Sequence, residues 1–142
     1  MKIAIIFLAI FLNACGNLES RAILEQNSPV ATSTNLTEDI GIEVFGGVFA
    51  SIVEKNSLLP STVSKTFSTS ADNQDQLTIA VYRGLSRKAH DNLFLGRYKI
   101  SGFKPELSGE PLIQVTFGVS KKEIWIEVKD LKNGRNLKIE KV

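Results

Sequence analysis

Few residues of this chain have side chains suited to covalent or metal chemistry. The sequence holds one cysteine, Cys15, and one histidine, His90, in 142 residues. A single thiol rules out a disulfide framework within the chain, and one cysteine with one histidine is too few for a Cys/His metal site. Ser61, Ser64 and Ser70 have no histidine or acidic residue in an arrangement typical of nucleophilic catalysis. We therefore expect no metal, no other cofactor and no enzymatic activity.

Charge also limits the partners. The 17 Lys and Arg residues nearly balance 15 Asp and Glu residues, and no basic face is evident. Nucleic acid is therefore not an expected partner. His90 lies within the charged segment 87–91, which predicts a solvated surface position rather than a catalytic one.

The position of Cys15 indicates one modification. The chain begins MKIAIIFLAIFLNACG, in which Lys2 precedes an apolar run over residues 3–12. That run is too short for a helix crossing a bilayer core, which takes about 20 residues, and it fits the apolar region of a secretory signal. The ending LNAC resembles the lipobox of bacterial lipoproteins. The resemblance implies a signal peptide over residues 1–14, lipidation of Cys15, and anchoring in the bacterial cell envelope on the periplasmic or extracellular face. An ordinary secretory signal with an incidental cysteine is the alternative.

Residues 15–39 differ in composition from the rest of the chain. After Cys15 this stretch is rich in Asn, Ser and Thr and contains Pro29, and its weak helical periodicity ends there. We predict a lipidated cysteine followed by a flexible polar tether. About twenty such residues have a root-mean-square span of roughly 25 Å, enough to lift a domain from the membrane.

From residue 40 the pattern is that of β-strands. Short runs with alternating or β-branched residues follow one another, separated by turn signals such as Gly46-Gly47, Asp72-Asn73 and Asn133-Gly134. Such spacing predicts an all-β fold, a two-layer antiparallel β-sandwich of about eight strands over residues 40–142. The eight runs are IEVFG, VFASIVEK, VSKTFSTS, QLTIAVYR, FLGRYKIS, LIQVTFGV, EIWIEVKD and NLKIEKV.

Several motifs in register carry a family resemblance. The string GIEVFGGV over residues 41–48 is similar to the GIExxGGV start of the substrate-binding β-domain in heat shock protein 70 (DnaK-type) chaperones. The stretch FSTSADNQ over residues 67–74 resembles the next signature, FSTxxDNQ. Residues 87–96, RKAHDNLFLG, resemble an RKxxxDNxxLG run with one position fewer before the Asp, and residues 111–117 resemble a PxIxVxF strand. Order and spacing agree over nearly the whole region after residue 40.

The resemblance implies a groove that holds an extended apolar peptide. Pocket positions of the family match Ile42, Phe67, Ile79 and Ile113, together with Leu77, which stands where the family usually has a smaller residue. The two residues that arch over the peptide in the family match Phe45 and Ser70. Val44, Ser68 and Thr69 are implied to offer backbone hydrogen bonds to the peptide. Asp72 matches a position that latches a helical lid, and we expect it to have no partner here.

The family's ATPase domain and helical lid have no counterpart in these residues. We therefore expect a membrane-anchored, ATP-independent peptide-binding domain that captures extended or unfolded polypeptide segments. The alternative is a structural or interaction lipoprotein that uses the sandwich to bind a specific folded partner or itself. Lys121, Lys122, Lys138 and Lys141 near strand ends are expected to discourage edge-to-edge pairing.

Overall fold

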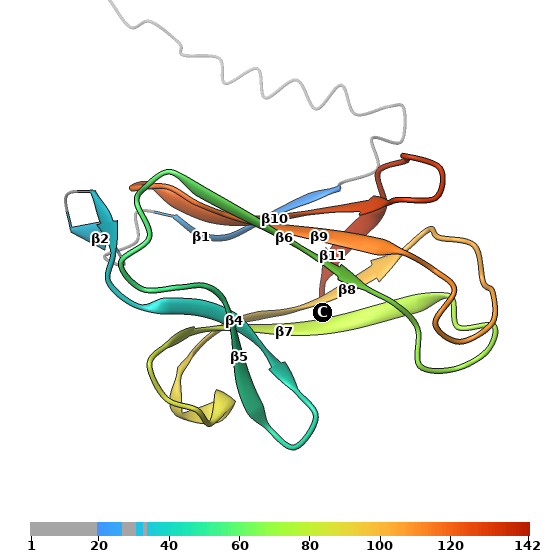
Figure 1. The fold of residues 1–142 in the computed structure, drawn as a ribbon, viewed down its shortest axis with the longest axis horizontal. Helices are drawn as coiled ribbons and strands as arrows, with labels where there is room; N and C mark the ends of the chain where they lie inside the picture. Colours follow the sequence, from blue (N-terminus) through green and yellow to red (C-terminus); the bar gives the residue numbers. More distant parts are fainter. Residues whose placement is uncertain (1–19, 27–30, 33) are drawn as a thin grey trace, which may run out of the picture.

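The computed structural model describes residues 20–26, 31–32 and 34–142, which form a two-layer sandwich of antiparallel sheets (Figure 1). The strands are β1 (Arg21–Gln26), β2 (Ala31–Thr32), β3 (Asn35–Leu36), β4 (Asp39–Val44), β5 (Val48–Val53), β6 (Ser61–Phe67), β7 (Gln76–Gly84), β8 (Leu93–Ser101), β9 (Ile113–Val119), β10 (Glu123–Asp130) and β11 (Lys138–Lys141). One layer has the order β1-β10-β9-β6, and the other has the order β11-β8-β7-β4-β5. The two-stranded ribbon β2-β3 lies at one end.

This architecture confirms the predicted all-β sandwich. Each of the eight predicted runs overlaps one of the strands β4 to β11. Among the described residues the only helical segment is the short 3-10 helix η1 (Ala89–Asp91), so no helix there is long and apolar enough to cross a membrane.

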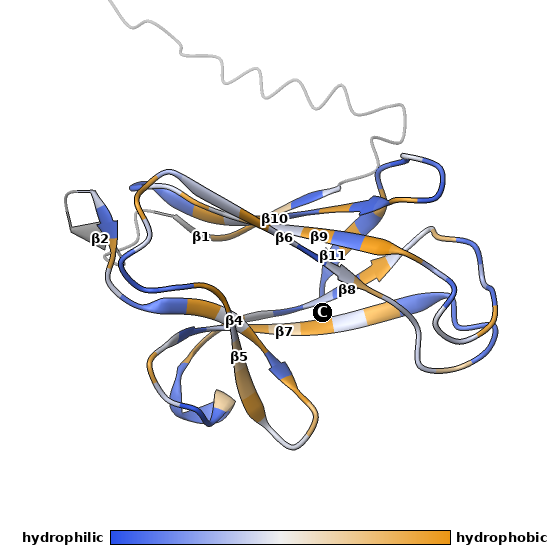
Figure 2. Cartoon of the chain, in the orientation of Figure 1, coloured by the Kyte–Doolittle hydropathy of each residue, from blue (hydrophilic) through white to orange (hydrophobic). Residues whose placement is uncertain are grey.

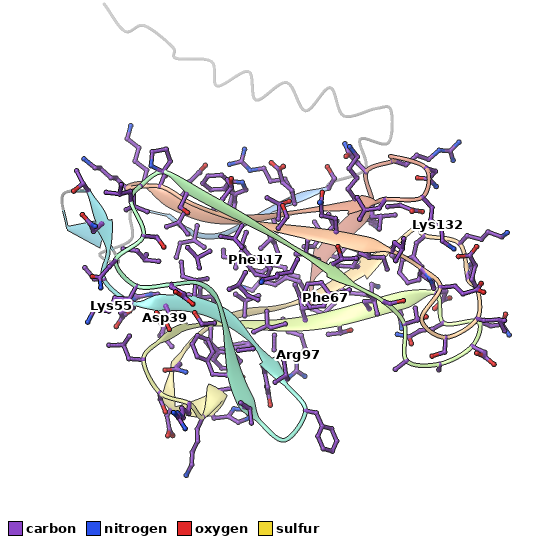
Figure 3. The ribbon with its side chains drawn as sticks, in the orientation of Figure 1. Asp39, Lys55, Phe67, Arg97, Phe117 and Lys132 are labelled. Carbon is purple, nitrogen blue, oxygen red and sulfur yellow. The ribbon has the colours of Figure 1, made fainter. Side chains whose placement is uncertain are left out.

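The hydrophobic core lies between the two sheets. Along β10, Ile124, Ile126 and Val128 are buried at alternating positions, because successive side chains of a strand point to opposite faces. Phe117 of β9 lies within this core (Figure 3), and Tyr98 of β8 belongs to the same cluster; both are fully buried. Figure 2 shows the same alternation of apolar and polar segments along the strands of both layers.

The presence of strand β1 contradicts part of the predicted tether over residues 15–39. It pairs antiparallel with β10, with Ala22 and Leu24 packed against the core and Ile23 exposed on the outer side. Leu36 of β3 is also buried. The tether prediction is therefore wrong for these stretches, and the folded region begins before residue 40. The physical reason is that alternating apolar side chains remove more surface from water as an edge strand than as a free chain.

Charged contacts fasten the start of β1 to the outer face of its sheet. The Arg21 guanidinium lies 2.7 Å from a Glu123 carboxylate oxygen and 3.7 Å from one of Glu127. It also lies 4.8 Å from the centre of the Trp125 ring, a cation–π arrangement. Trp125 is half-buried beneath this cation.

Candidate functional site

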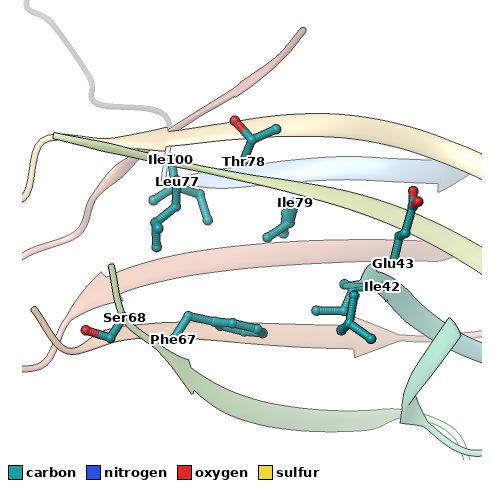
Figure 4. A pocket seen from close by; sticks show the side chains of 9 residues that line it. Ile42, Glu43, Phe67, Ser68, Leu77, Thr78, Ile79 and Ile100 are labelled. Carbon is teal, nitrogen blue, oxygen red and sulfur yellow. The ribbon is translucent and has the colours of Figure 1, made fainter. Parts of the chain in front are cut away.

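A cavity of about 230 Å³ opens at the side of the sandwich, between the end of β6 and the strands β4, β7 and β8 (Figure 4). Its wall is mostly aliphatic, with one aromatic ring and a few polar groups. Sites of this composition are typical of ligand-binding pockets. The lining residues are Ile42, Glu43, Val44, Phe67, Ser68, Leu77, Thr78, Ile79 and Ile100.

Strand alternation decides which side chains enter the cavity. Leu77, Ile79 and Ile100 point into it from one side, and Phe67 and Ile42 point toward it from the other (Figure 4). The side chains next to them in sequence, Thr78 and Glu43, point away. Polar residues of β4 and β7 thus contribute backbone to the wall, while apolar residues supply its surface.

Six of the ten residues predicted for peptide binding line this cavity: Ile42, Val44, Phe67, Ser68, Leu77 and Ile79. Ile113 does not, because it is fully buried in the core on β9, next to Phe67 in the β6–β9 register. Phe45, Thr69 and Ser70 lie outside the lining. Their predicted contacts with a peptide stay predictions.

Phe45 does not block the cavity. It lies at the tip of the β4–β5 hairpin and is fully exposed. The hairpin turns through Gly46 and Gly47, whose φ values of 83° and 73° are costly for residues with a Cβ atom. The amide of Gly47 donates a hydrogen bond to the carbonyl of Val44 at 3.1 Å, which closes the turn. The ring therefore leaves the cavity entrance unobstructed.

Leu77 stands in the wall of the cavity, which remains open. It pairs with Ile100 across the β7–β8 register, and both side chains stand in the same wall. Whether the larger side chain at this position narrows or shifts the pocket relative to the family stays a prediction.

The loop between β6 and β7 forms the second rim and is held by polar contacts. The Ser68 hydroxyl donates to the carbonyl of Pro111 at 2.6 Å. The side-chain carbonyl of Gln74 accepts hydrogen bonds from the amides of Ser70 and Ala71 at 3.1 and 3.3 Å. These bonds fix the loop in place beside the cavity.

Asp72 was expected to lack a partner, and that expectation is wrong. Its carboxylate accepts a hydrogen bond from the amide of Ser108 at 2.8 Å. The amide of Asn73 donates to the carbonyl of Glu106 at 2.9 Å. The tip of the β6–β7 loop is thereby tied to the loop that precedes β9, and Asp72 serves the fold of this rim.

Thr69 is buried on the same rim, at 5% exposure. Its carbonyl already accepts hydrogen bonds from the Gly109 amide at 3.0 Å and the Ser108 hydroxyl at 3.3 Å. Its own hydroxyl oxygen is buried without a hydrogen-bond partner. The carbonyl is thus committed to the neighbouring loop.

The hairpin is supported on the face opposite the cavity. The Tyr82 hydroxyl donates to a Glu43 carboxylate oxygen at 3.2 Å, and His90 Nε2 lies 3.4 Å from the other oxygen. Burial first, and then the Glu43 carboxylate, raise the pKa of Tyr82. The amide of Ala89 donates to the carbonyl of Gly47 at 2.9 Å. Polar contacts from η1 thus hold the β4–β5 hairpin in place.

Residues that were considered for catalysis make structural contacts instead. His90 is largely exposed and contacts Glu43 and Tyr82. The hydroxyl of Ser64 lies 2.8 Å from that of Thr116, on the outer face of the four-stranded sheet. Over residues 20–26, 31–32 and 34–142, no three His, Cys, Asp or Glu side chains are placed to hold a metal ion.

Comparison with protein families decides what kind of domain this is. The family described as Hsp70 protein matches residues 29–141, which is most of the chain. The chain belongs to the Hsp70 family. The match together with the sandwich fits the substrate-binding β-domain of Hsp70, a domain that is not itself catalytic, and it indicates chaperone-like binding of polypeptide. β1 lies before the matched residues.

Sequence reasoning missed three lining residues of this Hsp70 domain: Glu43, Thr78 and Ile100. Glu43 and Thr78 contribute mainly backbone, which residue types do not reveal. Ile100 had a usable signal, since an antiparallel β7–β8 pair places it opposite Leu77. Cys15 and the predicted signal peptide over residues 1–14 lie outside the described residues.

Proposed function

We propose that this chain is a membrane-anchored, ATP-independent peptide-binding domain with chaperone-like activity. It captures extended apolar segments of unfolded polypeptides at the surface of a bacterial envelope membrane. The observation that supports this most directly is the open cavity of about 230 Å³, walled by Ile42, Phe67, Leu77 and Ile79 and flanked by an unblocked rim at Phe45.

An extended peptide in this groove gains two kinds of contact. One apolar side chain enters the cavity, where burial of a leucine contributes about 1.5–3 kcal/mol. Backbone groups of the rims at Val44 and Ser68 then pair with peptide amides and carbonyls, as in other forms of β-strand recognition. Much of this gain offsets the ordering of the peptide, so a micromolar or weaker Kd is expected.

Nucleotide has no part in the proposed binding step. Every lining residue comes from β4, β6, β7 and β8 or from the rim loops of one sandwich, and loop hydrogen bonds already hold the rims open. Capture and release then depend on peptide affinity alone.

The anchor rests on the lipobox-like sequence around Cys15. Its test is metabolic labelling with palmitate together with membrane fractionation. The wild type is expected to carry label and to sediment with membranes, and the variant Cys15→Ser is expected to lose the label. A Cys15→Ser variant that still incorporates palmitate contradicts lipidation at this residue.

Peptide binding is tested on residues 16–142, which keep every described strand and lack the lipidation site. Fluorescence anisotropy follows a labelled leucine-rich heptapeptide, with and without ATP. Val44→Glu places a charge on the cavity rim at a half-exposed position and is expected to weaken binding at least about tenfold. The matched control, Leu85→Glu, changes an exposed leucine outside the cavity lining and is expected to bind normally.

Equal affinity of the two glutamate variants, or no binding by the wild type, contradicts the proposed groove. Such a result leaves the alternative of a lipoprotein that binds one folded partner. A change of affinity on adding ATP contradicts the nucleotide-independent part.

A further inference from the structure

The structure places the start of the folded region beside the β10–β11 turn. The carbonyl of Ser20 accepts a hydrogen bond from the amide of Val128 at 2.9 Å. The carbonyl of Val128 accepts one from the amide of Leu137 at 3.1 Å. The N–H and C=O of one strand residue point to the same edge, so Ser20 and Leu137 lie next to each other along β10.

The position of Ser20 limits how far the domain stands from its anchor. Only four residues, 16–19, separate Cys15 from Ser20. Five Cα-to-Cα steps span at most about 18 Å in any conformation. This inference rests on the proposed lipidation of Cys15, which holds that end at the lipid headgroups. The domain is then held against the membrane with Ser20 and the β10–β11 turn nearest to it.

Exposed apolar and basic side chains lie together at this end. Leu112 and Leu131 are 42% and 43% exposed, and the Leu131 amide donates to the carbonyl of Leu112 at 2.9 Å. Basic residues flank them within the same turn and at the end of β10. We call this set the anchor-side surface; its members are Leu112, Lys129, Leu131, Lys132 and Arg135.

Acidic residues nearby reduce but do not cancel the positive charge. Lys132 lies 2.6 Å from a Glu106 carboxylate oxygen, and the hydrogen bond it donates lowers the pKa of Glu106. Asp130 is buried, and its carboxylate accepts a hydrogen bond from the Lys132 amide. Counting Glu110 and Lys104 as well, four basic residues oppose three acidic ones. Lys129 and Arg135 provide the exposed charge.

We propose that the anchor-side surface docks on the anionic bilayer that holds the Cys15 lipid. Leucines inserted among headgroups and cations paired with phosphates are individually weak contacts. A short tether raises the effective concentration of the bilayer to the millimolar range or above, so weak contacts suffice.

Docking in this way orients the groove. The β4–β5 hairpin and the β10–β11 turn lie on opposite sides of the sandwich (Figure 1). With the turn on the membrane, the cavity rim at Val44 faces away from the lipid. Polypeptide in the aqueous compartment then reaches the groove without crossing the headgroup layer.

The test uses the mature lipidated chain in vesicles of phosphatidylcholine with or without phosphatidylglycerol. Leu131→Cys carries a small environment-sensitive fluorophore, since the lipid occupies the Cys15 thiol. Leu85→Cys, also exposed, is the matched control beyond the anchor-side surface. Spin-labelled lipid is expected to quench the label at residue 131 severalfold more than at residue 85, and more strongly with phosphatidylglycerol present.

A charge-reversal pair adds a second readout. A double variant with Lys129→Glu and Arg135→Glu is expected to reduce quenching at residue 131 to the level seen at residue 85. The control double variant, with Lys55→Glu and Lys65→Glu, is expected to leave the quenching unchanged. Equal quenching at residues 131 and 85 in a chain that is lipidated and membrane-bound overturns the docking and leaves the anchor intact. If the wild-type chain is found to carry no lipid, both the docking and the anchor are overturned.

Discussion

The ring of Trp125 lies across Gly118 on the neighbouring strand of the four-stranded sheet. The two residues are direct cross-strand partners in the β9–β10 register. A Cβ atom added at Gly118 would lie 2.1 Å from two ring carbons of Trp125, well inside van der Waals contact. The absence of a side chain at residue 118 is what lets the ring lie flat, half-buried, beneath Arg21.

Gly118→Ala is therefore expected to destabilise the fold by about 1–3 kcal/mol, the usual cost of forcing extra atoms into a packed site. Urea unfolding followed by tryptophan fluorescence measures this directly, because Trp125 is the chain's one tryptophan. The variant Trp125→Leu removes the ring and so tests whether the clash causes this cost. Because this variant lacks the tryptophan, its urea unfolding is followed by circular dichroism. In the Trp125→Leu background, Gly118→Ala is expected to cost less than it does in the wild type. Equal costs in the two backgrounds contradict the clash.

β1 provides a second stability prediction. Leu24 packs against the core and its neighbour Ile23 faces outward. Leu24→Glu is expected to lower the free energy of unfolding by about 1.5–3 kcal/mol, the scale for losing a buried leucine. Ile23→Glu, the matched control on the same strand, is expected to change it by less than about 0.5 kcal/mol. If both variants lower the free energy of unfolding in urea by equally small amounts, β1 does not pack against the core in solution.

The sequence predicted β4 to β11 because each strand carries alternating apolar residues or a run rich in β-branched residues, bounded by turn signals. It did not predict β1. Residues 21–26 follow a polar stretch and precede Pro29, and their apolar residues also fit a weak helical spacing. Only the partner strand β10 distinguishes these alternatives, since a short edge segment gains most of its stability from tertiary pairing.

The site was predicted in part for a similar reason. The family resemblance implied Ile42, Phe67 and Ile79 as pocket positions, and all three line the cavity. The same motifs placed Ile113 in the pocket, although it is fully buried in the core beside Phe67 and does not line the cavity. How deeply a side chain lies within a sandwich depends on how the two sheets pack. The residue pattern of a single strand carries no information about that packing. The partner of Asp72, the amide of Ser108, likewise comes from a loop distant in sequence.

The chain's two tyrosines predict a pH dependence at the alkaline end. Burial raises the pKa of Tyr82, with a further contribution from the Glu43 carboxylate, and burial raises the pKa of Tyr98. The folded state therefore favours the neutral phenols. Their contribution to stability is fully present below about pH 10, the unfolded value, and is lost as the pH rises through the folded pKa values.

Tyrosinate absorbance is expected to appear at higher pH in the native chain than in the urea-unfolded chain. Tyr82→Phe is expected to make the decline in stability above pH 10 less steep, because one of the two linked groups is removed. Native titration at the ordinary tyrosine value would contradict the burial of both hydroxyl groups.

Leu77 gives a prediction for peptide affinity. It stands in the cavity wall beside Ile100 and is only partly buried, so its outer atoms occupy space that a peptide side chain could fill. Leu77→Val removes one methylene from the wall. We expect this variant to bind a leucine-rich heptapeptide severalfold more tightly, since the peptide leucine buries more apolar surface, worth about 0.8 kcal/mol per added CH₂. The cost of Leu77→Val to the free energy of unfolding is expected to stay below about 1.5 kcal/mol.

Leu59→Val, which changes a partly buried leucine outside the cavity lining, is the matched control and should leave the Kd unchanged. Anisotropy titrations of both variants against the wild type, at matched fraction folded, decide the point. An unchanged Kd in Leu77→Val contradicts a peptide side chain resting against this wall.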